Sequence, residues 1–218
     1  MKVRAIPEQP LPTLLDAGSA LWNAASASSL KLMGTPVGLQ PTAIIRAAWM
    51  DRKIGAVSEV SVQAVCDGQT LAFRLEWADA TQNGAMGDTT AFPDGAAVLL
   101  PSSENSVVMT MGAPGAAVNA WYWRADEPAL GRHVVAEGLG STLSSDVVKA
   151  SGSWSSGRWR VVIARALKVE SGDPVAQLAS GQTTGFGVAI WDGASGERAG
   201  IKAFSGDWQE LALPQAGR

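Results

Sequence analysis

Residues 57–77 read VSEVSVQAVCDGQTLAFRLEW, and this stretch decides the fold class. Val57–Cys66 is rich in β-branched residues, which favour strands. Asp67-Gly68 follows as a dipeptide typical of tight hairpin turns. From Leu71 to Trp77, apolar residues alternate with small or charged ones, which is the period of a strand with one buried face. The stretch therefore predicts a β-hairpin.

Similar short apolar runs continue along the rest of the chain, separated by glycine, serine and aspartate. We expect further strands at residues 95–100, 106–111, 118–123, 134–137, 159–167, 186–190, 200–205 and 208–213. Within residues 118–123, the side chains of Asn119, Trp121 and Trp123 share one face, and those of Ala120 and Tyr122 share the other.

Helical periodicity is scarce. Residues 81–90 are predicted to form a loop, Ser144–Ala150 a short helix, and Thr13–Ala25 fits either a helix or irregular structure. No internal repeat or linker divides the chain. The sequence therefore predicts an all-β antiparallel sandwich with few short helices, and a single domain over residues 1–218.

The composition limits the classes of function. The chain has 218 residues, of which 46% are hydrophobic and 17% charged, so a sizeable core is expected. The net charge of −3 provides neither a basic surface for nucleic acid nor a polybasic membrane patch. No apolar stretch is long enough for a signal peptide or for a membrane-spanning helix, so we expect a soluble protein.

The chain contains one cysteine, Cys66, and one histidine, His133. A single cysteine excludes an internal disulfide and the paired thioether attachment of haem c. A single histidine excludes bis-histidine haem ligation and a histidine-rich metal site. We expect Cys66 to be a small buried side chain and His133 to be a surface or partly satisfied residue.

Motifs for catalysis are missing. The sequence lacks GxSxG and offers only one imidazole, so a hydrolase is the least favoured class. Asp79, Asp88 and Asp94 lie in expected loops without EF-hand spacing among them, which gives little support for a calcium site. The nine tryptophans fit either core packing or the aromatic platform of a carbohydrate-binding module. That module is the main alternative function.

Two separated blocks resemble a known family. Residues 92–126 read FPDGAAVLLPSSENSVVMTMGAPGAAVNAWYWRAD, and residues 186–205 read FGVAIWDGASGERAGIKAFS. The first block resembles an M-G-x-x-G-x-x-V-N-x-W-Y-W motif, and the second an E-R-x-G-x-K motif. Together with VVAEG at 134–138, they resemble the haem b-binding gamma subunits of ethylbenzene dehydrogenase and steroid C25 dehydrogenase, in the type II branch of dimethyl-sulfoxide-reductase-like molybdenum enzymes.

The resemblance implies one haem b whose iron is held by a methionine and a lysine. These positions fall on Met111 and Lys202. Met109 is the nearest competitor, because it would share a strand face with Met111. The resemblance further implies that the porphyrin lies between the two sheets. We expect it to be lined by Trp121, Trp123, Phe186 and Ile190, with Arg124 and Arg198 as candidates for its propionates.

The implied role is electron transfer without catalysis. A catalytic alpha subunit would carry molybdopterin and oxidise a hydrocarbon or steroid side chain, and a beta subunit would carry iron–sulfur clusters. The chain would complete this heterotrimer and pass electrons to an external acceptor such as a cytochrome. Members of this family work in the periplasm, so export together with a signal-bearing partner is expected.

Overall fold

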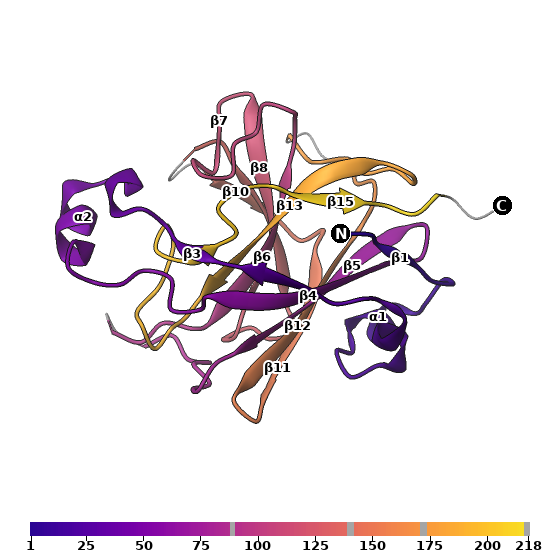
Figure 1. Ribbon diagram of the computed structural model, residues 1–218, viewed down its shortest axis with the longest axis horizontal. Coiled ribbons are helices and arrows are strands. Elements are labelled where there is room, and N and C mark those ends of the chain that lie inside the picture. Colours follow the sequence, from indigo (N-terminus) through magenta and orange to yellow (C-terminus); the bar gives the residue numbers. More distant parts are fainter. Residues whose placement is uncertain (88–89, 139–141, 171–173, 216–218) are drawn as a thin grey trace.

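The computed structural model describes residues 1–87, 90–138, 142–170 and 174–215. Two curled sheets form a sandwich (Figure 1). All strand pairs are antiparallel except β1 with β4. The predicted all-β antiparallel sandwich is therefore confirmed. Asp88, one of the three aspartates singled out in the sequence, lies outside the described residues.

The smaller sheet has six strands, in the order β1-β4-β5-β12-β11 with β2 paired to β4. Its central hairpin is the one that residues 57–77 predict, and Gly68 adopts a positive φ of 92° in the turn. The six strands are β1 (Arg4–Ala5), β2 (Ser28–Lys31), β4 (Glu59–Cys66), β5 (Thr70–Ala78), β11 (Lys149–Ser155) and β12 (Arg158–Ala166).

The larger sheet has nine strands, in the order β10-β9-β8-β6-β13-β14-β3, with β15 paired to β13 and β7 to β8. These nine strands are β3 (Met33–Gly34), β6 (Gly95–Pro101), β7 (Gly112–Ala113), β8 (Ala116–Arg124), β9 (Gly131–Ala136), β10 (Thr142–Ser145), β13 (Thr183–Trp191), β14 (Ala203–Phe204) and β15 (Gln209–Ala212).

The helices are short and lie outside the sandwich. They are α1 (Leu11–Leu15), η1 (Ala20–Ala24), η2 (Val37–Leu39) and α2 (Ala43–Trp49). In Figure 1, α2 projects at one end of the molecule and α1 packs near the opposite end. Among the described residues, no helix combines the length and apolar character needed to cross a bilayer.

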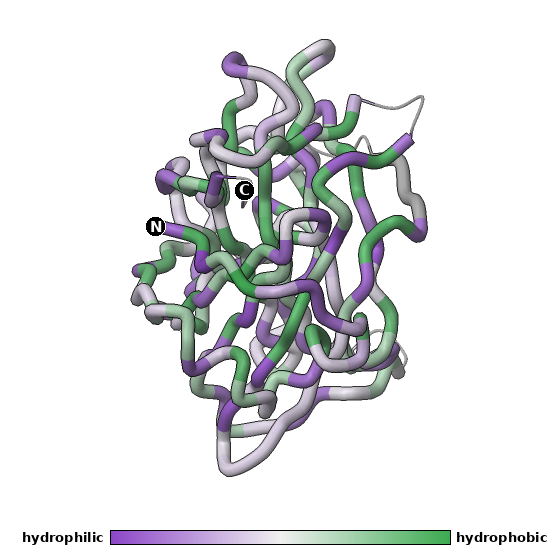
Figure 2. Tube along the Cα trace, turned by 90° about the vertical axis from the view of Figure 1, so that its right-hand side faces the viewer, coloured by the Kyte–Doolittle hydropathy of each residue, from purple (hydrophilic) through white to green (hydrophobic). Residues whose placement is uncertain are grey.

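The main core fills the space between the two sheets. Trp121 and Trp123 from β8 pack there against Phe73 and Trp159 from the smaller sheet, with ring centroids 6.0 and 4.9 Å apart. Phe186 stacks on Phe73 at 5.9 Å. Hydrophobic and hydrophilic segments alternate along the trace in Figure 2, as expected for strands with one buried face.

A second apolar cluster covers the outer face of the nine-stranded sheet. It contains the side chains that alternate with the inner ones, including Ala120 and Tyr122 of β8 and Trp191 of β13. The predicted division of β8 into two faces is therefore confirmed. This sheet is apolar on both sides, so its outer face is a place where a ligand or a partner can bind.

Two element predictions are wrong. Ser144–Ala150 is not a helix, because its residues belong to the ends of β10 and β11 and the segment between them. Ser106–Met111 is not a strand. There the chain turns back on itself, with hydrogen bonds from Met111 N to Val108 O at 3.0 Å and from Gly112 N to Val107 O at 2.9 Å.

The close packing of β11 on β8 predicts that a side chain at Gly152 would destabilise the protein. A Cβ atom at Gly152 would lie 2.2 Å from Cζ2 of Trp123. The indole cannot move easily, because its Nε1 donates to Pro128 O at 2.9 Å and its ring abuts Trp159. We expect Gly152→Ala to lower the free energy of unfolding by about 2 kcal/mol, measured by urea denaturation. Ser153→Ala, at the exposed neighbouring position, serves as the control and should change it by less than about 0.5 kcal/mol.

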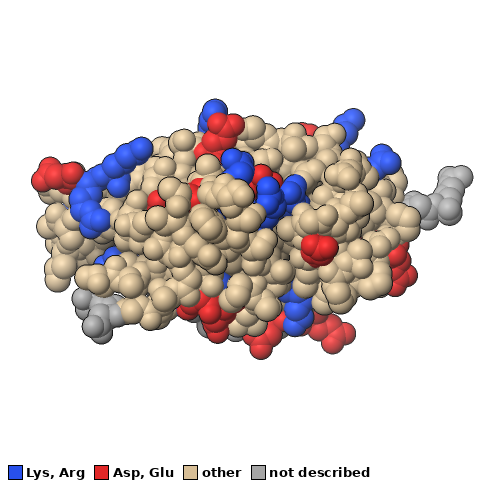
Figure 3. All heavy atoms as spheres, turned by 90° about the horizontal axis from the view of Figure 1, so that it is seen from below, with Lys and Arg blue, Asp and Glu red and all other residues tan. Residues whose placement is uncertain are grey.

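The charges on one face of the molecule carry no strong pattern. On the face shown in Figure 3, acidic and basic side chains are interspersed and leave much of the surface uncharged. This distribution agrees with the small net charge and shows no basic stripe on that face.

Candidate functional site

Met111 lies in a strained turn beside the outer face of the nine-stranded sheet. Its φ is 55°, a left-handed conformation that is uncommon for a residue with a side chain. Gly112 follows with a φ of 82°, and a Cβ atom there would lie 2.6 Å from Ala136 O. The glycine allows the turn to pack directly against β8 and β9. Strain of this kind is often retained at functional sites.

Lys202 comes to the same face from the segment that leads into β14. Its backbone is held by Thr35, whose N donates to Lys202 O at 3.0 Å. The side chain is only 3% exposed, and in the described part of the chain no acceptor receives a hydrogen bond from its Nζ. Trp191 is its aromatic neighbour, with Nζ 5.5 Å from the ring centroid. With no acceptor among the described residues and an open pocket beside it, the amine of this largely buried side chain is a strong candidate for a ligand.

Met111 and Lys202 line one open pocket on this outer face. The cavity volume of this pocket is about 360 Å³, within the range of small-molecule and cofactor sites. Small side chains and glycines make the hollow, and Tyr122 and Trp191 form an aromatic wall. The other lining residues are Ala120, Val134, Ala136, Gly138, Ala199 and Gly200.

A smaller hollow adjoins the pocket and shares Met111, Gly200 and Lys202 with it. Met109 lines this hollow but not the larger pocket. Both methionines line the smaller hollow, and the expected shared strand face does not form because residues 106–111 are a turn. Only Met111 faces the space that Lys202 and the aromatic wall enclose.

The two predicted propionate partners lie beside the same site. Arg124 and Arg198 line a neighbouring pocket that is continuous with the first through Tyr122, Trp191 and Ala199. Arg124 is paired with the carboxylate of Asp126, and its Nε donates at 2.9 Å. Arg198 lies over the ring of Phe92, with its Cζ 4.1 Å from the centroid.

The structure does not bring the predicted lining residues to this pocket. Trp121, Trp123, Phe186 and Ile190 are fully buried in the core between the sheets. They project from the opposite face of the sheet to the one that carries the pocket, because their positions on β8 and β13 alternate with those of Tyr122 and Trp191. A group held by Met111 and Lys202 would therefore lie on the outer face of the sheet and not between the sheets, where the resemblance implies that it lies.

Sequence reasoning missed Ala120, Val134, Ala136, Tyr122, Trp191 and Gly200 as parts of this site. One signal was available. The strand period places Ala120 and Tyr122 on the face of β8 opposite Trp121. It does not tell which of the two faces packs against the other sheet. The strain at Ala199, whose φ is 51°, could not be seen in the sequence.

Burial perturbs both ionisable groups that line the pocket. It lowers the pKa of Lys202 from 10.5 to about 8, because the ammonium loses its hydration there. It also raises the pKa of Tyr122 to about 12, so this phenol stays neutral. Near neutral pH the pocket therefore needs only a modest interaction to hold Lys202 as the neutral amine that can bind a metal ion.

This lowered pKa makes the stability of the ligand-free protein depend on pH. Between about pH 8 and 10.5 the unfolded chain keeps the Lys202 proton and the folded chain does not, so the free energy of unfolding rises with pH. Below about pH 8 the full cost of burying the charge is present. We expect Lys202→Met to remove that part of the pH dependence and to stabilise the ligand-free protein by about 3 kcal/mol at pH 7.

Urea denaturation of both proteins across pH 7 to 11 checks this expectation. Subtracting the two curves of unfolding free energy against pH leaves the contribution of Lys202, because Tyr122 and the other groups titrate in both proteins. Equal slopes for wild type and Lys202→Met would contradict the assignment of a buried ammonium.

Cys66, His133 and most of the tryptophans are buried and contribute to packing. Cys66 is buried in the main core, as expected, and burial raises the pKa of its thiol. His133 is buried in β9 and does not lie at the surface. Seven of the nine tryptophans are buried, and the other two, Trp154 and Trp208, are half-buried. Core packing is therefore the main role of the tryptophans.

Comparison with known proteins agrees with the motifs around this pocket. Residues 19–142 and 131–203 match the family described as ethylbenzene dehydrogenase. The chain belongs to this family. Both candidate ligands fall within the matched residues, and the resemblance to the ethylbenzene dehydrogenase gamma subunits is confirmed.

Three relatives in this family are named as subunits. The chain is 38% identical over 160 residues to the chlorate reductase subunit gamma of Ideonella dechloratans, covering 72% of this chain and 65% of that protein. It is 28% identical over 205 residues to a respiratory nitrate reductase heme subunit of Haloferax mediterranei, covering 93% and 67%. It is 29% identical over 160 residues to the dimethylsulfide dehydrogenase subunit gamma of Rhodovulum sulfidophilum, covering 69% and 58%. The chain thus spans about two thirds of the length of these relatives.

Solved structures with a similar fold come from another class of protein. A carbohydrate-binding module of family 9 from Caldicellulosiruptor kristjanssonii, in complex with glucose, has a TM-score of 0.52 at 10% identity, covering 100% of this chain and 97% of that one. Its complex with cellotriose gives 0.51 at 10% identity, covering 100% and 95%. At this identity the likeness shows the sandwich fold alone.

Proposed function

We propose that this ethylbenzene dehydrogenase family chain is a non-catalytic electron-transfer subunit with one haem b on the outer face of its nine-stranded sheet. Met111 and Lys202 would be the axial ligands. The observation that carries the proposal is that these residues, 91 positions apart in the chain, line the same apolar pocket. The family membership and the heme subunit among the relatives support the same cofactor.

The residues of the pocket fit this group in three ways. Lys202 is buried with a lowered pKa, and no described residue accepts a hydrogen bond from its Nζ, so the amine would be free to bind iron. Met111 offers a soft thioether that favours ferrous iron. The wall of Tyr122 and Trp191, whose rings meet edge to face at 5.1 Å, offers the apolar surface that a macrocycle needs.

A bound haem supplies reversible one-electron transfer. If Met111 and Lys202 both held the iron, they would leave it no open position for a substrate, which would favour electron transfer over catalysis. A bound haem would pack on the apolar wall, and burial against it would tune the potential. Arg124 and Arg198, in the adjoining pocket, would meet the propionates through charge-assisted hydrogen bonds.

The proposed partners follow from the relatives, two of which are named as gamma subunits of a reductase and a dehydrogenase. We place this chain, residues 1–218 acting as one haem-binding domain, beside a molybdenum-containing alpha subunit and an iron–sulfur beta subunit. An external acceptor such as a cytochrome would exchange electrons with the haem. The periplasm is the proposed compartment, reached together with a signal-bearing partner.

The competing function is a carbohydrate-binding module, since such modules share the fold. A sugar platform needs exposed aromatic rings on one face, and none of the nine tryptophans is exposed. A sugar module also gives no reason to bury Lys202 without an acceptor. These features favour a haem-binding subunit over a carbohydrate-binding module.

Haem reconstitution tests the proposal. The full chain is titrated with haemin, reduced with dithionite and assayed as the pyridine haemochrome. We expect a low-spin haem b spectrum that saturates at one haem per chain. Failure to bind haem while cellotriose quenches tryptophan fluorescence would overturn the proposal in favour of the sugar module.

A further inference from the structure

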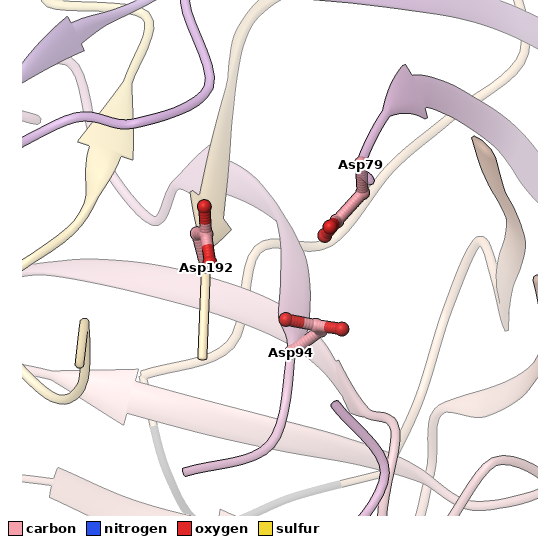
Figure 4. Close-up of side chains that lie close together, drawn as sticks. All are labelled: Asp79, Asp94 and Asp192. Atoms are coloured by element: carbon pink, nitrogen blue, oxygen red, sulfur yellow. The ribbon is translucent and has the colours of Figure 1, made fainter. Parts of the chain in front are cut away.

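Three carboxylates gather at one end of the sandwich. Asp79 follows β5, Asp94 precedes β6, and Asp192 follows β13. One oxygen from each carboxylate lies within 4.8 Å of the others. Figure 4 shows Asp79 extending toward the other two aspartates from a different part of the chain. The cluster therefore joins segments of both sheets.

One of these carboxylates has a buried oxygen without a partner. Asp79 is 7% exposed, and among the described residues its Oδ2 accepts no hydrogen bond of good geometry, although the nearby Trp77 indole opposes the rise in the pKa of this carboxyl. The other oxygen, Oδ1, accepts from Thr81 N at 3.0 Å. A buried carboxylate oxygen that lacks a donor is costly, so it calls for a cation or a proton.

Neutral oxygen ligands stand next to the cluster at regular spacing. The loop after β5 reads Asp79-Ala80-Thr81-Gln82-Asn83-Gly84. Positions 1, 3 and 5 of this run carry oxygen, and position 6 is glycine, as in the first half of an EF-hand loop. Oγ1 of Thr81 and Oδ1 of Asn83 already meet at 2.8 Å. Asp79, Asp88 and Asp94 do not have this EF-hand spacing among themselves, because positions 3 and 5 of the loop are Thr81 and Asn83.

The charges at this end are poorly balanced by the protein. In the described part of the chain, no Lys or Arg forms an ion pair with any of the three aspartates. Burial raises the pKa of Asp79 and raises that of Asp94 to about 6, and a neighbouring carboxylate adds to each shift. Asp94 is stabilised by N–H donors. Asn83 N and the Trp159 indole donate to its Oδ2 and Gly193 N donates to its Oδ1, so Oδ1 is the oxygen that can accept a further contact.

We propose that Asp79, Asp94 and Asp192, with oxygen atoms from Thr81 and Asn83, form a calcium site that ties the two sheets together. Calcium fits better than magnesium, because it accepts an irregular set of carboxylate, hydroxyl and amide oxygens, whereas magnesium demands near-ideal octahedral geometry. Asp79 extends from the smaller sheet, and Asp94 and Asp192 from the larger one. The cation would thus stabilise the sandwich at this end.

Terbium luminescence tests the site directly, because tryptophans adjoin it. Trp159 donates to Asp94 Oδ2 at 2.9 Å, and Trp154 donates to Asp79 O at 3.0 Å. The full chain is stripped with a chelator, and Tb³⁺ is added under tryptophan excitation. We expect sensitised emission that saturates at one ion per chain and is displaced by CaCl₂ at lower concentrations than by MgCl₂.

The matched variants are Asp192→Asn, at the most exposed of the three carboxylates, and Asp51→Asn, at an exposed aspartate outside the cluster. We expect Asp192→Asn to weaken terbium binding at least about 10-fold and Asp51→Asn to leave it unchanged. CaCl₂ at about 100 times its Kd should raise the Tm of wild type by about 6 °C.

Three results would overturn the site: no sensitised emission from the stripped wild type, emission that CaCl₂ does not displace, or emission that is equal in Asp192→Asn. The wild-type measurements decide the question even if the variant does not fold. None of these readouts depends on haem, so the calcium site and the proposed function can fail separately.

Discussion

Replacing Met111 with alanine is expected to convert the haem-loaded protein from a low-spin to a high-spin spectrum. The variant would lose the thioether proposed to bind the iron, and no other described residue that lines the pocket offers a sulfur atom. We expect haem affinity to fall by about 100-fold, equivalent to about 2.7 kcal/mol. The optical spectrum and a haemin titration measure the two effects.

Met109→Ala is the matched control, because Met109 lies two residues away and lines only the adjoining hollow. It removes the same side chain from the same turn and should keep the low-spin spectrum. The reverse pattern, with Met109→Ala changing the spin state and Met111→Ala leaving it intact, would reassign the ligand.

Filling the pocket is expected to abolish haem binding without unfolding the protein. Val134 is half-buried on the outer face of β9 and lines the pocket, so Val134→Trp would place an indole in the space proposed for the macrocycle. We expect at least a roughly 100-fold loss of haem affinity. The Tm of the haem-free variant should change by less than about 4 °C, because the added ring has open space to occupy.

Val107→Trp is the control for this variant, since Val107 is 52% exposed and lines none of the pockets described above. It should bind haem as wild type does. Normal haem binding by Val134→Trp would mean that the cofactor lies elsewhere, with the space between the sheets as the next place to search.

The sequence was a good guide to the fold because the strand signals are local. The hairpin of β4 and β5 follows from alternating apolar residues around Asp67-Gly68, and the two faces of β8 follow from the same period. The turn at Ser106–Met111 was mistaken for a strand, because apolar residues there pack on the outer face of the sheet from a turn. Apolar composition alone does not distinguish the two.

The candidate ligands were predictable only through the family resemblance. Neither a methionine before a glycine nor a lysine near the end of the chain signals a metal site by itself. The place of the pocket could not be derived, because period 2 tells which residues share a face but not which face meets the other sheet. Trp121 and Trp123 appeared equally able to line a cofactor or a core, and long-range packing against Phe73 and Trp159 decides for the core.

The aspartate cluster could not be predicted from the sequence either, because it depends on long-range contacts. Asp79, Asp94 and Asp192 come together through contacts between strands that are distant in sequence, so spacing among Asp79, Asp88 and Asp94 could not reveal it. Fold likeness did not help with function either, since the structurally similar modules bind sugars on a shared sandwich. Function here follows from the side chains on one sheet face.

The central claim is that the haem iron lies on the outer face of the nine-stranded sheet between Met111 and Lys202. A crystal structure of the haem-loaded chain, with anomalous diffraction recorded at the iron absorption edge, tests this claim most directly. The account predicts one iron peak at bonding distance from Met111 Sδ and Lys202 Nζ, beside Tyr122 and Trp191. An iron peak in the core between the sheets, among Phe73, Trp121 and Phe186, would contradict it.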